Sequence, residues 1–159
     1  MNDERWVPES NERSNTKLLR ERLLIKKATL ATYISMYSDT ITPELGIPKL
    51  KKRVDPNLPI SVLLFGMGAD MHTASLFPGG DKLEEALSNN APTLLPMRAA
   101  GAMEARMTLT AQVLNSSRFK HLVIFGEEKR KAFEKAINLP NSIAPISAIL
   151  PGASVHWAA

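Results

Sequence analysis

Two apolar runs that do not alternate with polar residues constrain the fold of this chain more than any other feature. ISVLLF occupies residues 60–65 and FKHLVIF occupies residues 119–125, and a glycine follows each run. A strand with one face in water alternates apolar and polar side chains, whereas a strand buried on both faces is apolar nearly throughout. The two runs therefore predict strands of a mostly parallel sheet that helices cover on both faces.

Several other segments have helical patterns. Residues 126–137 are acidic in their first turn and basic further along, residues 81–89 predict a short helix, and residues 14–28 begin with two capping residues and carry leucines four apart. Residues 36–59 contain four prolines and a glycine, which predicts an irregular surface connection. The order of strand, loop and helix predicts an α/β fold, in which ligands bind beyond the carboxyl ends of the strands.

Length, charge and cysteine content narrow the class of protein. With 159 residues, 44% of them hydrophobic, we expect one domain over residues 1–159. The net charge of +4 arises in residues 1–53, where 11 Lys and Arg alternate with 7 acids as on a solvated helix face. We therefore expect no nucleic-acid partner, whereas a small anionic substrate fits. The chain has no cysteine, no signal peptide and no apolar run near the roughly 20 residues of a membrane span, so we expect a soluble cytoplasmic protein.

The segment FGMGADMHTASLFPGG, residues 65–80, holds the candidate chemistry. Asp70 and His72 lie two apart on a loop after the first strand, so both can face one cavity, with the carboxylate fixing the imidazole. The third glycine of a dinucleotide-binding loop is missing, and Ser75 lacks the flanking glycines of a nucleophile elbow, so we interpret Ser75 as a hydrogen-bonding or capping residue. The three histidines lack the spacing of a helical zinc pair, and no metal site is expected.

Taken in order along the chain, several segments resemble the 6-phosphogluconolactonase family. The central segment GMGADMHTASLFPG is similar to that family's G-x-G-x-DGHTASLFPG signature and is the most specific match. The resemblance extends over nearly the whole chain. The other matching segments are DERWVP at residues 3–8, SN at 14–15, RMTLT at 106–110, LN at 114–115, GEEK at 126–129 and VHW at 155–157.

The resemblance implies a Rossmann-like, mostly parallel sheet flanked by helices, with the site at its strand ends. It implies hydrolysis of 6-phospho-D-glucono-1,5-lactone to 6-phosphogluconate in the oxidative pentose phosphate pathway, without a cofactor. His72 matches the general base that activates water, and Asp70 matches the acid of the same signature. Histidine, with an unperturbed pKa near 6.5, suits this task at neutral pH. The implied substrate-binding residues are Arg5, Asn15, Gly68, Ser75, Arg106 and Lys129, among which Arg106 and Lys129 match positions associated with the phosphate.

The sequence departs from the family pattern in two places. Met71 stands where the family has glycine, which is costly if the position needs a positive φ. The family also carries a first strand, an SGGSTP-like phosphate loop and further strand–helix units ahead of DER-x-VP, so we expect a partial domain whose sheet lacks its first strands. Such a sheet exposes an edge and an apolar face, which predicts self-association into a homo-oligomer. The alternative function is a non-catalytic remnant that at most binds a sugar phosphate.

Overall fold

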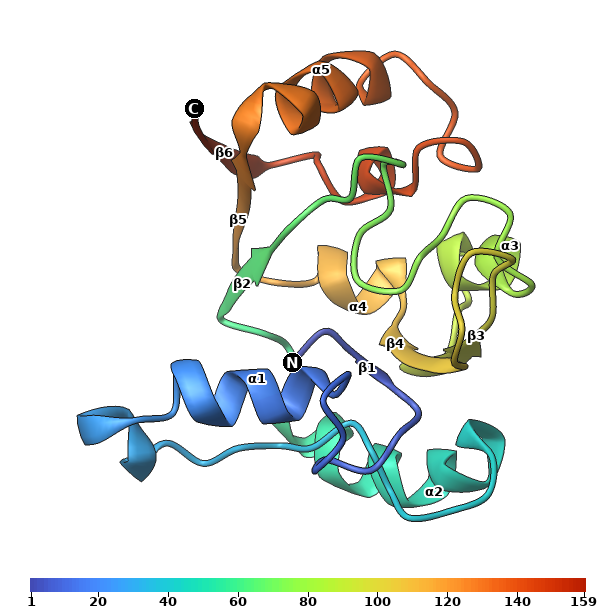
Figure 1. The fold of residues 1–159 in the computed structure, drawn as a ribbon. Helices are drawn as coiled ribbons and strands as arrows, with labels where there is room; N and C mark the ends of the chain where they lie inside the picture. The colour runs from blue at the N-terminus through green and yellow to red at the C-terminus, as the bar shows by residue number, and fades with distance from the viewer.

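The computed structural model describes residues 1–159 and contains two three-stranded sheets. The first is parallel, in the order β2-β5-β6, and the second is antiparallel, in the order β1-β4-β3. The strands are β1 (Asp3–Arg5), β2 (Val62–Phe65), β3 (Leu94–Met97), β4 (Arg106–Leu109), β5 (Phe119–Phe125) and β6 (Ala153–Ala158). The helices are α1 (Asn15–Arg22), α2 (Pro43–Val54), α3 (Leu83–Leu87), α4 (Ala111–Asn115) and α5 (Gly126–Ala136), with 3-10 turns at Lys26–Leu30, Asp55–Asn57 and Pro145–Ala148 (Figure 1).

The parallel sheet and the α/β class are confirmed. Strand β5 has the predicted bounds, β2 begins two residues after the predicted start, and the two strands pair in register from Val62 and Phe119 to Phe65 and Leu122. The antiparallel sheet was not predicted. Each of its strands has only three or four residues, and alternation of apolar and polar residues cannot be recognised over so short a segment. The pairing of the strands also depends on contacts between segments that are distant in the sequence.

The prediction of an irregular connection over residues 36–59 is wrong for residues 43–54, which form helix α2. Pro43 lies in the first turn of the helix, where its missing N–H is not needed. Pro48 lies inside the helix, where proline removes one backbone hydrogen bond. Tertiary packing overrides this cost, since Leu50 is fully buried and Val54 is buried against the core.

Helix α1 is shorter than the predicted segment of residues 14–28. The side chain of Ser14 accepts a hydrogen bond from the backbone N–H of Lys17 and so caps the helix as expected, but the helix ends at Arg22. Leu18 and Leu23 are 60% and 63% exposed, so this helix has no apolar face packed against the core that would extend it.

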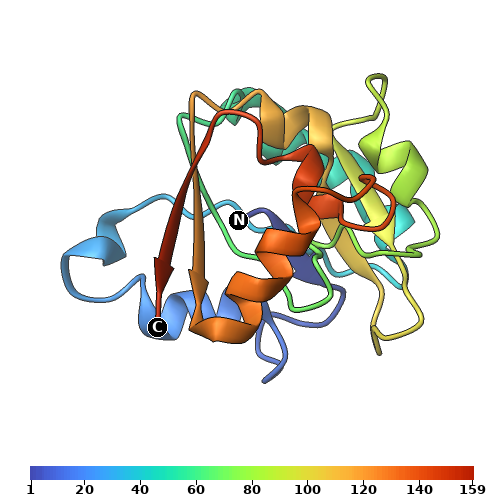
Figure 2. The ribbon, with the colours of Figure 1, turned by 90° about the horizontal axis from the view of Figure 1, so that it is seen from above.

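The parallel sheet is covered by helix on one face only, which agrees with the expected exposed apolar face but not with strands buried on both faces. Along β2, Leu63 and Phe65 are buried, whereas Val62 and Leu64 are 59% and 65% exposed. Helix α5 lies along one face of β5 and β6 (Figure 2). One continuous core joins the covered face to the antiparallel sheet, while the other face is open to solvent.

Candidate active site

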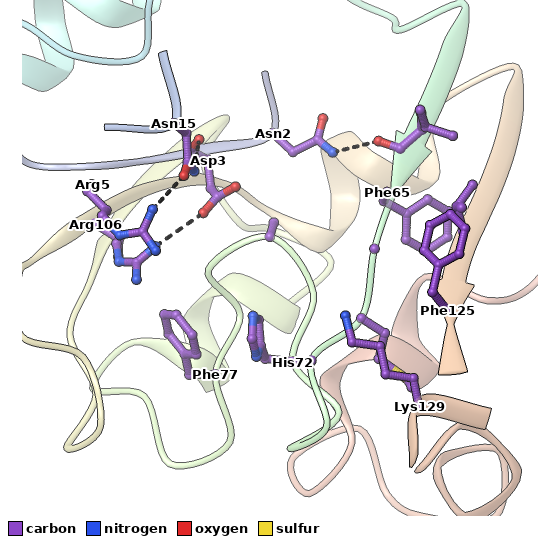
Figure 3. A pocket seen from close by; sticks show the side chains of 16 residues that line it. Asn2, Asp3, Arg5, Asn15, Phe65, His72, Phe77, Arg106, Phe125 and Lys129 are labelled. Atoms are coloured by element: carbon purple, nitrogen blue, oxygen red, sulfur yellow. Dashed lines mark hydrogen bonds and ion pairs between the residues drawn. The ribbon is translucent and has the colours of Figure 1, made fainter. Parts of the chain in front are cut away.

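A pocket of about 620 Å³ lies beyond the carboxyl end of β2, between the two sheets. This is the position that the parallel sheet predicts for a ligand site. Six of the predicted site residues line the pocket, and Asp70 and Ser75 lie outside its lining. Figure 3 shows Arg5 and Arg106 together on one side, His72 between, and Lys129 on the other side. The polar side chains of the lining belong to Asn2, Asp3, Arg5, Asn15, His72, Arg106 and Lys129.

His72 and Asp70 form a hydrogen-bonded pair in the loop after β2. The distance from His72 Nδ1 to Asp70 Oδ1 is 2.5 Å, and the backbone N–H of His72 donates to the same oxygen at 3.3 Å. The Asp70 side chain is 57% exposed, so this carboxylate reaches the pocket only through the imidazole. A carboxylate on Nδ1 holds the proton there and leaves Nε2 as the nitrogen that can accept one. The ring of His72 packs on Phe77, with 4.8 Å between the centroids.

Gly68 and Met71 set the backbone shape that supports this pair. A Cβ on Gly68 would overlap His72 Nδ1 and Asp70 Oδ1, so a side chain at this position would displace the pair. The Gly68 N–H donates to the His72 carbonyl at 3.0 Å and is therefore not free to bind an oxyanion. Met71 has a φ of +68°. The left-handed conformation costs a non-glycine residue about 1–2 kcal/mol.

Two guanidinium groups meet on one wall of the pocket. One Nη of Arg5 donates to Asn15 Oδ1 at 2.6 Å and to the Arg13 carbonyl at 2.9 Å. An Nη of Arg106 lies 3.8 Å from Asp3 Oδ2, and its guanidinium lies over the Phe77 ring. Burial, and secondarily the charge of Arg5, lower the pKa of Arg106 from its usual value. The Nε atoms of both arginines are buried without a hydrogen-bond partner, which leaves this wall with unmet donor capacity.

Lys129 supplies the cation on the opposite wall. It lies in the first turns of α5 and makes no hydrogen bond or ion pair with its side chain, whereas its neighbour Arg130 pairs with Glu127 and Glu134. Figure 3 shows its ammonium end directed toward the side of the pocket that holds His72. An unpaired, half-buried cation in a pocket is suited to an anionic ligand.

Ser75 is fully buried and acts through Asp3, a pocket residue that the sequence did not single out. The Ser75 hydroxyl donates to Asp3 Oδ2 at 2.7 Å, on the carboxylate that faces Arg106. Burial raises the pKa of the Asp3 carboxyl, and the Ser75 hydrogen bond and the Arg106 charge oppose that shift. Ser75 therefore positions a carboxylate at the pocket wall.

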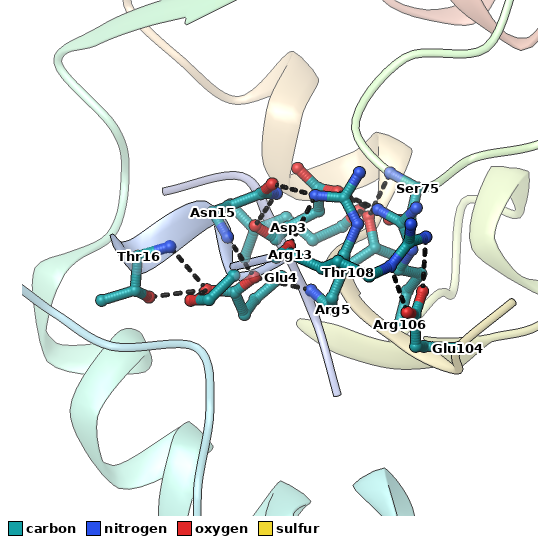
Figure 4. A network of polar contacts seen from close by, with 12 residues as sticks. Asp3, Glu4, Arg5, Arg13, Asn15, Thr16, Ser75, Glu104, Arg106 and Thr108 are labelled. Carbon is teal, nitrogen blue, oxygen red and sulfur yellow. Dashed lines mark hydrogen bonds and ion pairs between the residues drawn. The ribbon is translucent and has the colours of Figure 1, made fainter. Parts of the chain in front are cut away.

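Glu4 is the second residue that the sequence did not identify. Its carboxylate is fully buried and accepts from the backbone N–H groups of Asn15 and Thr16 at 2.8 and 2.7 Å and from both neighbouring hydroxyls, Ser14 and Thr16 (Figure 4). A carboxylate at a helix N-terminus satisfies orphan donors and the helix dipole. Glu4 thereby fixes the start of α1, which presents Asn15 to Arg5. Glu4 belongs to the DER segment that the sequence analysis quoted. Its role could not be identified there, because it depends on helix α1 folding onto the carboxylate.

Two further structural findings bear on the class of site. No three His, Cys, Asp or Glu side chains come together in a way that could hold a metal ion. None of the helices combines the length and the apolar character that crossing a bilayer requires.

Comparison with known proteins gives the family. A family model described as glucosamine-6-phosphate isomerases/6-phosphogluconolactonase matches residues 1–157. The 6-phosphogluconolactonase of Rhizobium meliloti is 36% identical over 98% of this chain and 70% of its own length, and that of Mesorhizobium japonicum is 39% identical over 98% and 68%. The crystal structure of a 6-phosphogluconolactonase from Shewanella baltica superposes with a TM-score of 0.94 at 31% identity, over 99% of this chain and 70% of that one. The chain therefore belongs to the family of glucosamine-6-phosphate isomerases and 6-phosphogluconolactonases.

Proposed function

We propose that the chain hydrolyses 6-phospho-D-glucono-1,5-lactone to 6-phosphogluconate, a step of the oxidative pentose phosphate pathway, with His72 as general base. The observation that carries the proposal is the position of His72, which lines one pocket with Arg106 on one wall and Lys129, which makes no ion pair, on the other. The relatives named above carry the name of this activity. The reaction as proposed consumes water and uses no cofactor.

The proton transfers follow from the pairing of His72 with Asp70. With Nδ1 held by the carboxylate, Nε2 takes a proton from water while the water oxygen bonds to the lactone carbonyl carbon. The carbonyl oxygen becomes an oxyanion. As the oxyanion collapses, the bond from the carbonyl carbon to the ring oxygen breaks, and the imidazolium returns its proton to that oxygen, which leaves as the 5-hydroxyl.

The cations of the pocket are assigned to the anionic part of the substrate. Guanidinium groups bind phosphate through paired, charge-assisted hydrogen bonds, and the nearest acid of Arg106, Asp3, lies 3.8 Å from one Nη, beyond hydrogen-bond distance. Lys129 faces the same pocket and has no competing acid. Binding energy at a phosphate remote from the carbonyl holds the lactone in one orientation over His72.

A second candidate function is the binding of a sugar phosphate without catalysis. Two observations favour it. Met71 holds the catalytic loop in a conformation that suits glycine, and Leu64 and Phe125, on one wall of the pocket, are each 65% exposed. A pocket that excludes water poorly weakens every electrostatic interaction within it.

Replacing His72 with Asn tests the proposal. The substitution removes the proton acceptor and keeps a polar side chain of similar size, so we expect lactone hydrolysis above the spontaneous rate to fall by about 10²–10⁴. The matched control is His156→Asn, which changes a histidine outside the pocket and should hydrolyse close to the unmodified rate. The measurement is the rate of acid release from the freshly prepared lactone, corrected for its uncatalysed hydrolysis.

Two results would count against the enzyme. Hydrolysis by the unmodified chain at no more than the spontaneous rate removes the catalytic proposal, and calorimetric binding of 6-phosphogluconate in the same preparation then favours the binding protein. Full activity of the His72→Asn variant removes the role of His72 and leaves the reaction class in place.

A further inference from the structure

The face of the parallel sheet opposite α5 is an apolar surface with no element packed on it. We call this surface the open face and define it by Val62 and Leu64 of β2, Phe119, His121, Val123 and Phe125 of β5, and His156 of β6. Strand pairing places these side chains together, since Val62 is paired with Phe119 and Val123 with His156. Val62, Leu64, Phe119 and Phe125 are 59%, 65%, 57% and 65% exposed. Large contiguous apolar surfaces of this kind mark interaction sites.

The open face carries no charged side chain. Alternate residues of β5 point to the covered face, and these include Lys120, whose ammonium group is buried and bonded to the Asn115 side chain and the Ile149 carbonyl. The histidines of the open face meet each other, with 3.0 Å between His121 Nδ1 and His156 Nε2. An uncharged apolar surface on a chain of net charge +4 does not fit a nucleic acid or an acidic partner. It is complementary to an identical surface.

The surface area of the whole chain is consistent with an uncovered interface. The chain exposes 8984 Å² at a mass of 17.5 kDa. Compact monomers of this mass expose about 7,900 Å², so the excess is about 1,100 Å². A standard protein interface buries about 800 Å² on each partner. The excess belongs to the whole chain and is large enough to include one side of a standard interface.

A cavity at the edge of the open face offers an anchor point. It has a volume of about 180 Å³ and is bordered mainly by apolar side chains, among them Val62, Ile34, Met36 and Leu58. Val62 belongs to both the cavity and the open face. Interfaces concentrate their binding energy where a large apolar side chain fills such a pocket on the partner.

We propose that two copies of the chain associate through their open faces about a twofold axis. The two sheets then stack face to face, at the spacing of about 10 Å that packed sheets adopt. Because Leu64, Val123 and Phe125 also line the candidate active site, the second copy narrows the solvent opening of that pocket. A further polypeptide segment is the competing occupant, since about 30% of the length of the relatives has no counterpart among residues 1–159.

Replacing Phe119 with Asp tests the association without touching the pocket lining. In the dimer, a carboxylate at residue 119 would be buried in the interface between the two copies. We therefore expect the dissociation constant of the dimer to rise about tenfold or more. The matched control is Ile41→Asp, which adds the same charge at a side chain that is 93% exposed and outside the open face. Sedimentation velocity and light scattering over a roughly hundredfold range of concentration give the dissociation constants. Circular dichroism confirms that each variant is folded, and Val62→Asp replaces Phe119→Asp if the latter does not fold.

We expect the unmodified chain and Ile41→Asp to dimerise and the open-face variant to remain monomeric at the same concentrations. A purified, folded chain that stays monomeric throughout overturns the proposal and leaves the face for another polypeptide. A dimer that survives both Phe119→Asp and Val62→Asp overturns it as well, because another surface must then mediate it.

Discussion

Met71 is a non-glycine residue in a left-handed backbone conformation, which favours glycine. Its φ of +68° favours glycine, while its side chain packs partly against the core. We predict that Met71→Gly is more stable than Met71→Ala by about 1 kcal/mol, because both lose the same packing and only glycine relieves the left-handed backbone. Urea unfolding of the two variants measures the difference.

The control for this prediction is Ala69→Gly, two residues earlier in the same loop. Ala69 is exposed and is not among the residues with positive φ, so glycine there should destabilise by up to about 1 kcal/mol. If Met71→Ala proves as stable as Met71→Gly, the conformation at residue 71 is not the source of strain.

The site residues that could be predicted from the sequence are those whose role is local or carried by a motif. His72 and Asp70 lie two apart on one loop, and their contact follows from that spacing. Asp3 could not be predicted, because its role depends on Ser75, from a distant loop, and on Arg106, from another strand. Ser75 was assigned to the substrate, whereas in the structure its hydroxyl is used by that carboxylate.

At the scale of elements, helix α2 allows a test of two prolines in one helix. Pro48 lies in the helix interior, where alanine would restore a backbone hydrogen bond, so we predict that Pro48→Ala stabilises the chain by about 1–3 kcal/mol. Pro43 lies in the first turn, where proline is preorganised, and Pro43→Ala should be neutral or slightly destabilising. Thermal and urea unfolding of both variants provide the comparison. Equal effects of the two substitutions would contradict the assignment of Pro48 to a regular helix interior.

The elements that the sequence predicted correctly have a strong internal period or an unbroken apolar run. Strand β5 and helix α5 are examples, and their bounds agree with the predictions within a residue. Helix α2 was missed because proline is a local signal against helix, whereas the buried side chains of Leu50 and Val54 stabilise it from a distance. The apolar runs at residues 60–65 and 119–125 predicted strands covered on both sides, because such a run does not reveal which element packs on each side. The exposed apolar face was predicted instead from the departure of the sequence from the family pattern.

At the scale of the whole molecule, the two sheets share one core. Leu63 and Leu122 of the parallel sheet belong to the same buried cluster as Met107 and Leu109 of the antiparallel sheet. We therefore propose that residues 1–159 unfold as a single cooperative unit, in which neither sheet keeps its structure when the other is lost.

The two tryptophans report separately on the two halves of that unit. Trp6 follows β1 and donates its indole N–H to the Thr40 carbonyl, whereas Trp157 lies in β6 and donates to the Gly126 carbonyl. In the single-tryptophan variants Trp6→Phe and Trp157→Phe, we predict that fluorescence and far-ultraviolet circular dichroism give the same midpoint in urea within each variant, because the shared core couples the reporters. A tryptophan whose signal changes well before the backbone signal would show that its sheet unfolds on its own. The boundary between the two unfolding units would then lie at the pocket, with Arg106 in one unit and Lys129 in the other. Because a ligand in the pocket would contact both units, its binding would stabilise the less stable unit against urea.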